Sequence, residues 1–137
     1  MPWAKRIDHT DYDALTAALE RDIKRLSEME SRGGLMVRLH ALGDFFSVPY
    51  VLFWSKMLSN YPRLAVYGYT ARRPEDKDQI GHWIAKTKIH HGPRFAIRWS
   101  DGGYDQCSTV SIRSPEDKPD NAFICPEQTG ATQCCAT

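Results

Sequence analysis

The sequence has 137 residues, of which 42% are hydrophobic and 26% are charged, and this size and composition are typical of one globular domain. Such a composition excludes a disordered or fibrous protein. The formal net charge of +1 is also much lower than that of a dedicated nucleic-acid-binding protein, which is strongly basic. We therefore predict a single domain over residues 1–137.

The sequence contains no candidate for a membrane span or a signal peptide. Its apolar stretches are far shorter than the roughly 20 residues that cross a bilayer, and its N-terminus lacks the apolar run of a secretory signal. We expect a cytoplasmic protein without membrane contact. Residues 33–113 hold 11 basic and 6 acidic side chains, a moderate surplus that suits a small anionic ligand and disfavours nucleic acid without excluding it.

The first predicted element is an amphipathic helix at about residues 11–31. Its apolar residues recur at steps of three and four, and charged residues lie between them. Thr10 and Asp13 resemble a capping box at the helix start, and Gly33 and Gly34 supply a stop at the other end.

The middle of the chain alternates between strands and helices. Ser47 is a predicted N-cap of a helix that Pro62 ends, and the acidic residues after Pro74 are expected in the first turn of another. The predicted strands are residues 35–41, 64–70 and 94–100, with short additions at 108–113 and 122–125. This alternation predicts an α/β fold with a mostly parallel sheet, resembling part of a barrel or a half-barrel.

Polar residues gather where the predicted strands end, which is where parallel α/β sheets bind ligands. The candidates are His40 and Asp44 as catalytic residues, and Arg38, Arg98, Tyr69 and Arg72 as ligand-binding residues. Strand alternation places Arg38, His40 and Arg98 on one face, which would be a barrel interior, a cleft or open to solvent. Two guanidinium groups and an imidazole together suit a phosphate or carboxylate.

Each candidate also has a purely structural interpretation. Arg38 could form a salt bridge with Asp44 or Asp101, and His40 could be a buried histidine bonded to a backbone carbonyl. Asp44 could simply cap a tight turn after Gly43. The pair His90 and His91 fits a solvated helix end better than a metal site.

The four cysteines all lie in the last third of the chain. They are Cys107, Cys125, Cys134 and Cys135, and their spacing matches no standard zinc pattern. Common phosphate-loop, dinucleotide-binding, zinc-protease and hydrolase motifs are also missing from the sequence.

One block of the sequence nevertheless resembles a known family. The run of residues 37–47, from Val37-Arg38-Leu39-His40 through Gly43-Asp44-Phe45 to Ser47, is followed by the strand Tyr67-Gly68-Tyr69-Thr70. This arrangement resembles the phage and prophage gene product 88 family, and Cys125-Pro126 with Cys134 is similar to the cysteine segment of that family. The resemblance covers about residues 12–137.

The resemblance implies a phage- or prophage-associated protein with a barrel-like α/β domain, distantly similar to radical-SAM-type barrels. It also implies an iron–sulfur cluster or zinc at Cys125, Cys134 and Cys135. Family members carry further cysteines, so the chain would be a truncated relative with an incomplete set of metal ligands. Two functions remain open: an enzyme-like anion-binding pocket, or a non-enzymatic protein that binds a host protein or nucleic acid.

Overall fold

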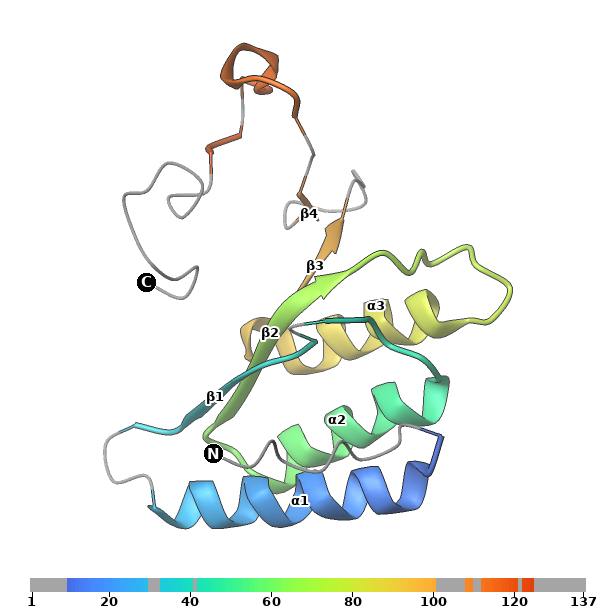
Figure 1. The fold of residues 1–137 in the computed structure, drawn as a ribbon. Coiled ribbons are helices and arrows are strands. Elements are labelled where there is room, and N and C mark those ends of the chain that lie inside the picture. The colour runs from blue at the N-terminus through green and yellow to red at the C-terminus, as the bar shows by residue number, and fades with distance from the viewer. Residues whose placement is uncertain are drawn as a thin grey trace, which may run out of the picture.

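The computed structural model describes residues 10–29, 33–40, 42–100, 108–109, 112–120 and 122–124. Helices and strands alternate along the chain (Figure 1). Their bounds are α1 Tyr12–Met29, β1 Leu35–Arg38, α2 Val48–Asn60, β2 Leu64–Thr70, α3 Ile80–His91, β3 Phe95–Ser100 and β4 Ser108–Thr109, with short 3-10 helices at Gly92–Arg94 and Pro115–Asp117.

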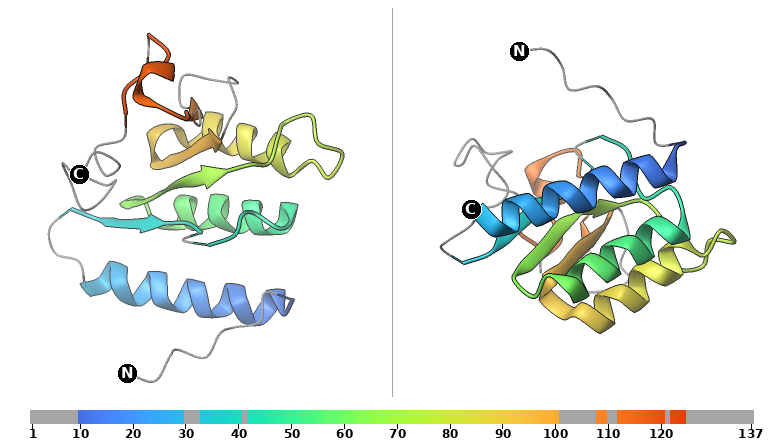
Figure 2. Two further views of the ribbon diagram at one scale, coloured as in Figure 1. Left: turned by 45° about the horizontal axis from the view of Figure 1, so that its top comes forward. Right: turned by 90° about the horizontal axis from the view of Figure 1, so that it is seen from below.

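The strands form one parallel sheet in the order β1-β2-β3-β4, so the predicted α/β fold is confirmed. The helices α2 and α3, which connect the first three strands, pack against each other on one side of the sheet (Figures 1 and 2). The helix α1 lies beside α2 on that side, and the Tyr12 hydroxyl donates a hydrogen bond to the Pro49 carbonyl. Sequential strand order with the helices on one face is the winding of a barrel segment.

The core lies between this helical layer and the sheet. The buried residues of the strands alternate with exposed ones, and the buried set faces α2 and α3. The largest fully buried side chains include Trp54, Phe45, Phe95, Met57 and Ile97. Burying a side chain of this size stabilises the fold by roughly 1.5–3 kcal/mol.

The starts of α1 and α2 follow from side-chain caps. At α2, Ser47 has extended backbone and its Oγ accepts a hydrogen bond from Tyr50 N at 3.3 Å, which confirms the predicted cap. At α1, Asp11 Oδ1 accepts a hydrogen bond from Ala14 N at 3.0 Å. Asp11 therefore caps the first turn of α1, and the predicted capping box of Thr10 and Asp13 stays a prediction.

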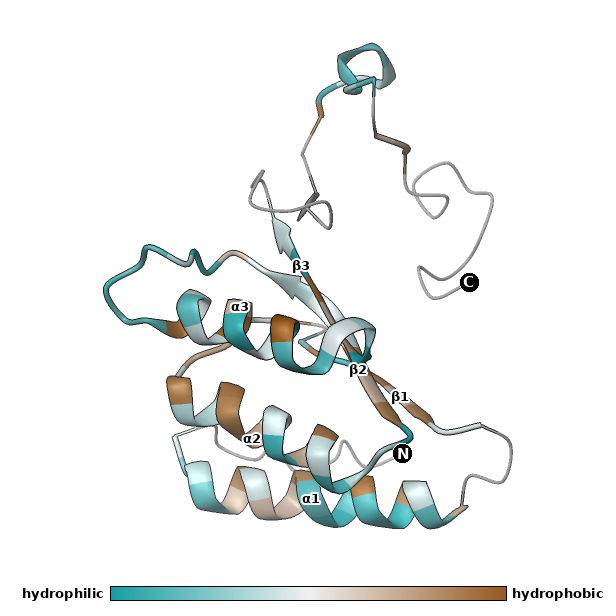
Figure 3. Cartoon of the chain, turned by 180° about the vertical axis from the view of Figure 1, so that it is seen from behind, coloured by the Kyte–Doolittle hydropathy of each residue, from teal (hydrophilic) through white to brown (hydrophobic). Residues whose placement is uncertain are grey.

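The third helix starts later than the sequence predicted. Its first residue is Ile80, so the acidic residues 75, 76 and 78 precede the helix instead of forming its first turn. Asp76 Oδ2 accepts from Arg73 N at 2.9 Å, and Asp78 Oδ1 accepts from Ile80 N at 3.0 Å. These local hydrogen bonds support turns at residues 74–75 and 77–78, and the hydrophilic connection from β2 to α3 is teal along most of its length in Figure 3.

Several described residues of the predicted C-terminal strands do not form strand. In the predicted segment 108–113, Ser108 and Thr109 form strand and Ile112 and Arg113 do not, while residues 110 and 111 lie outside the described residues. The predicted last strand at 122–125 is not observed, since residues 122–124 are irregular and Cys125 lies outside the described residues. None of the helices in the described ranges is both long enough and apolar enough to cross a membrane.

Candidate functional site

The face of the sheet opposite the helices is exposed within the described part of the chain. Arg38 on β1 and Arg98 on β3 are exposed, Tyr69 on β2 has 37% of its surface exposed, and Tyr67 is half-buried. Met36 on β1 is 64% exposed on the same face. Parallel sheets are normally covered on both faces, so a face that none of the described helices covers is unusual. We call this surface the open face.

The strand register brings four of these residues together. Arg38 is paired with Tyr67 across β1 and β2, and Tyr69 is paired with Arg98 across β2 and β3. The two tyrosines therefore lie on the middle strand, between the two arginines. From the spacing and rise of strands, the Arg38 and Arg98 Cα atoms lie about 12 Å apart. Because arginine side chains are long, both guanidinium groups can reach one ligand that lies over β2.

Among the described residues, no acidic side chain neutralises either arginine of the open face. Arg25 pairs with Asp22 and Arg72 pairs with Asp78, whereas Arg38 and Arg98 take part in no hydrogen bond or ion pair within the described ranges. The strands β1, β2 and β3 contain no acidic residue. The alternative pairing of Arg38 with Asp44 is therefore not observed, and Asp101 lies outside the described residues.

The His40 side chain does not lie on the sheet face that carries Arg38, contrary to the prediction. The strand β1 ends at Arg38, and His40 has the left-handed φ of 55°. Its ring packs edge-on against Phe45, with centroids 4.6 Å apart, and lies 5.7 Å from the Tyr50 ring. Strand alternation fails here because the chain turns after Arg38, so the imidazole lies against core aromatic rings.

The His40 imidazole has no hydrogen-bond partner within the described ranges. Both ring nitrogens are buried and unpaired there, although the side chain as a whole is only half-buried. The predicted structural role, a bond to a backbone carbonyl, is therefore not observed. Burial lowers the pKa of His40, and the Asp44 charge partly opposes this shift. The imidazole is consequently neutral near pH 7, with one donor and one acceptor nitrogen.

Asp44 connects two loops at the carboxyl end of the sheet. Its Oδ1 accepts hydrogen bonds from Phe45 N and Thr70 Oγ1, and its Oδ2 accepts one from Ala71 N, each at 2.7 Å. These bonds join the segment after β1 to the end of β2. Asp44 makes no hydrogen bond to His40 among the described contacts, so it influences the imidazole through its charge alone.

Arg72 strengthens the same connection. Its Nε donates to the Phe45 carbonyl at 2.8 Å, its backbone N donates to Thr70 Oγ1 at 3.1 Å, and its guanidinium pairs with Asp78 at 3.3 Å. We call Asp44, Thr70 and Arg72 the clasp. These contacts occupy Arg72, whereas Tyr69, the other candidate from β2, lies on the open face.

Two residues of this region, Tyr67 and Thr70, were not among the site residues predicted from the sequence. Tyr67 belongs to the open face, and its position two residues before Tyr69 was the signal that could have found it. Thr70 is 2% exposed and central to the clasp, but a threonine at a strand end gives no signal of this role in the sequence.

The predicted metal ligands Cys125, Cys134 and Cys135 lie outside the described residues. Within those residues, no group of three or more histidine, cysteine, aspartate or glutamate side chains is placed to hold a metal ion. The iron–sulfur or zinc site thus stays a prediction. The histidines 90 and 91 lie at the end of α3, where His91 Nε2 is 2.8 Å from Ser55 Oγ of α2.

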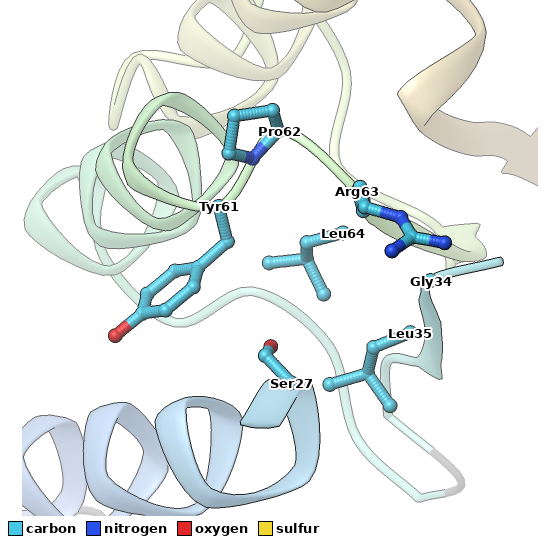
Figure 4. Close-up of a pocket in the computed structure, with 7 residues that line it drawn as sticks. All are labelled: Ser27, Gly34, Leu35, Tyr61, Pro62, Arg63 and Leu64. Atoms are coloured by element: carbon cyan, nitrogen blue, oxygen red, sulfur yellow. The ribbon is translucent and has the colours of Figure 1, made fainter. Parts of the chain in front are cut away.

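Two shallow hollows in the described residues lie away from the open face. One, of about 150 Å³, lies where the end of α1 meets the starts of β1 and β2, and its lining includes Ser27, Leu35 and Tyr61 (Figure 4). The other, of about 390 Å³, lies between α1 and α2. Neither is lined by a predicted site residue.

Comparison with known proteins gives one match. The gene product 88 family matches residues 3–91, which include α1 to α3 with Arg38, His40, Asp44, Tyr69 and Arg72. Arg98 and the cysteines lie beyond the matched segment. The curated proteins and the solved structures compared with the chain contain no match. Because the match spans well over half of its length, the chain belongs to the gene product 88 family, a family of phage-type proteins.

Proposed function

We propose that the protein binds an anionic ligand on the open face, with Arg38 and Arg98 as its charged contacts. This proposal is supported by two guanidinium groups that have no partner among the described residues and that lie on a surface whose strands contain no acidic residue. Guanidinium groups bind phosphate and carboxylate through paired hydrogen bonds. A ligand over β2 would contact both arginines and the Tyr67 and Tyr69 side chains.

His40 is the candidate for proton transfer at this end of the sheet. Support comes from its neutral imidazole, its strained backbone and its two unpaired nitrogens, since such features often mark functional positions. Its ring is packed against Phe45 and Tyr50, so a ligand reaches it only if the segment after β1 moves. Binding is therefore the primary proposal, and catalysis by His40, with Asp44 acting through its charge, is secondary to it.

Calorimetric titration with inorganic pyrophosphate tests the binding proposal. We expect Arg38→Gln and Arg98→Gln each to weaken binding about tenfold, because each removes a charge-assisted hydrogen bond. The matched control is Arg63→Gln, which removes the same charge from an exposed arginine at the opposite end of β2. Absence of binding by the unmodified protein, or an equal loss in the control, would overturn the proposal.

A further inference from the structure

The open face carries aromatic rings as well as positive charge. Tyr67 and Tyr69 lie about 7 Å apart along β2, from the rise of a strand, and their side chains are on the same face. Neither ring stacks on another aromatic ring of the described residues, in contrast to Phe45, Phe46, Tyr50 and Phe53, which form a connected aromatic cluster in the core. Both rings are consequently available to a ligand.

The shape of this surface disfavours a small molecule as the natural ligand. Sites for small molecules are usually cavities that bury most of the ligand, whereas the two hollows described above are elsewhere. The exposed side chains on β1, β2 and β3 instead form a platform across neighbouring strands. A platform of this kind suits an extended ligand that brings its own flat rings and repeated charges.

The arginines and the tyrosine rings of the open face together limit which classes of ligand fit it. A second copy of this chain docked face to face would bring four guanidinium groups together without an acidic partner from the strands, which is repulsive. An acidic peptide would satisfy Arg38 and Arg98 but would offer no flat ring to the tyrosines. Single-stranded nucleic acid offers both phosphates and bases, and sheet faces with exposed aromatic residues bind it by stacking.

We infer that the open face binds single-stranded nucleic acid, with bases stacked on Tyr67 and Tyr69 and phosphates contacted by Arg38 and Arg98. This inference rests on the proposed function, because the same arginines supply the anion contacts. A duplex keeps its bases stacked internally and cannot use the tyrosines. The preference for single strands is therefore the property that distinguishes this inference from general attraction to polyanions.

Fluorescence anisotropy with a labelled eight-nucleotide oligothymidylate tests the inference on the full chain. We expect Tyr67→Leu and Tyr69→Leu each to weaken binding about tenfold, with Tyr69→Phe close to the unmodified protein, since the ring performs the stacking. Tyr61→Leu is the control, because Tyr61 is half-buried beside the hollow of Figure 4. Circular dichroism checks that each variant is folded.

The salt dependence gives a second readout. Two neutralised phosphates predict a slope of about −1.4 for log K against log salt concentration, or a loss of about sevenfold between 50 and 200 mM salt. Oligonucleotide binding that the tyrosine variants weaken while pyrophosphate binding is unchanged would support the inference.

Three results would overturn it. If pyrophosphate binds but the oligonucleotide is insensitive to the tyrosine variants, the inference fails and the anion site stands. If a duplex or a polyaspartate peptide binds as tightly as the single strand, the inference also fails. If neither pyrophosphate nor the oligonucleotide binds, the proposed function fails with it.

Discussion

At the scale of single residues, Asp44 shows how one carboxylate can fix two loops. Its two oxygens accept three hydrogen bonds, two from backbone N–H groups and one from the Thr70 hydroxyl. Hydrogen bonds to an ionised group stabilise more than neutral ones, by about 1.5–3 kcal/mol each. The position of His40 and the end of β1 relative to β2 therefore depends on Asp44.

We expect Asp44→Asn to lower the free energy of unfolding by about 2–3 kcal/mol. The amide nitrogen of asparagine is itself a donor, so it cannot accept the hydrogen bond that a backbone N–H or the Thr70 hydroxyl donates to Asp44. Urea denaturation followed by circular dichroism measures the change. Asp13→Asn on the exposed surface of α1 is the control, since the Asp13 side chain is exposed. A loss in Asp44→Asn no larger than in this control would contradict the structural role of the clasp.

The His40 imidazole makes stability depend on pH. Burial lowers the pKa of His40 in the folded protein, whereas the pKa of a histidine in an unfolded chain is about 6.5. As the pH falls below about 6.5, His40 is protonated in the unfolded chain before it is protonated in the folded protein. The free energy of unfolding is therefore highest above this pH and decreases as the solution becomes more acidic. The pKa of His91 is lowered too, by burial first and then by His90 and Arg94, and adds to the same trend.

We expect His40→Asn to reduce the slope of unfolding free energy against pH between 7.5 and 5 without abolishing it. Asparagine tolerates the left-handed backbone at this position, so the variant removes the titrating group and keeps the turn. His82→Gln on the exposed side of α3 serves as control. An unchanged slope in His40→Asn would show that this imidazole does not resist protonation in the folded state.

The residues of the site were predictable to different degrees. Arg38 and Arg98 could be placed on one face because both lie inside strands, where side chains alternate strictly. His40 could not, because the alternation ends with the strand and a single left-handed residue redirects the ring. The partners of Asp44 could not be predicted either, since Thr70 and Ala71 are 26 and 27 residues away along the chain.

At the scale of elements, Arg94 joins the end of α2 to the sheet. Its Nε donates to the Leu64 carbonyl at 2.9 Å, and one terminal nitrogen donates to the Leu58 and Tyr61 carbonyls at 2.6 and 2.7 Å. Carbonyls at the end of a helix lack partners within the helix, and a cation there also interacts well with the helix dipole. One side chain thus fixes where α2 ends relative to β2.

We expect Arg94→Lys to destabilise the fold by about 1–3 kcal/mol, because a single ammonium group cannot reproduce the fork of the guanidinium. The urea unfolding midpoint measures the effect. Arg98→Lys is a matched control four residues later, on the open face, where the guanidinium makes no hydrogen bond or ion pair with the described residues. Equal destabilisation of the two variants would contradict the role of Arg94.

The start of α3 shows why element boundaries were harder to predict than element types. The sequence correctly indicated a helix between β2 and β3, since Ile80 and Ile84 are buried and Trp83 packs beside the core. Acidic residues before it suggested a first helical turn. In the structure, Asp76 and Asp78 instead bond the backbone of their own turns, and such local competition is not visible in a charge pattern.

At the scale of the whole molecule, the alternation of strands and helices was sufficient to predict a parallel sheet. The sheet also uses the strands in sequence order, which leaves the three helices on one side (Figures 1 and 3). Polar residues inside the strands had already indicated that one face is not buried in a second helical layer. The weaker periodicity after residue 100 explains why Ile112, Arg113 and residues 122–124 were predicted as strand, although the described part of the chain has no strand at these positions.

The core residues and the proposed binding residues lie on opposite sides of the same strands. The residues that face α2 and α3 hold the core, while Arg38, Tyr67, Tyr69 and Arg98 face away from it. We therefore expect substitutions on the outward side to change the proposed binding with little loss of stability. On the proposed function, the ligand preference of this protein would change by single mutations, without passing through an unstable intermediate sequence.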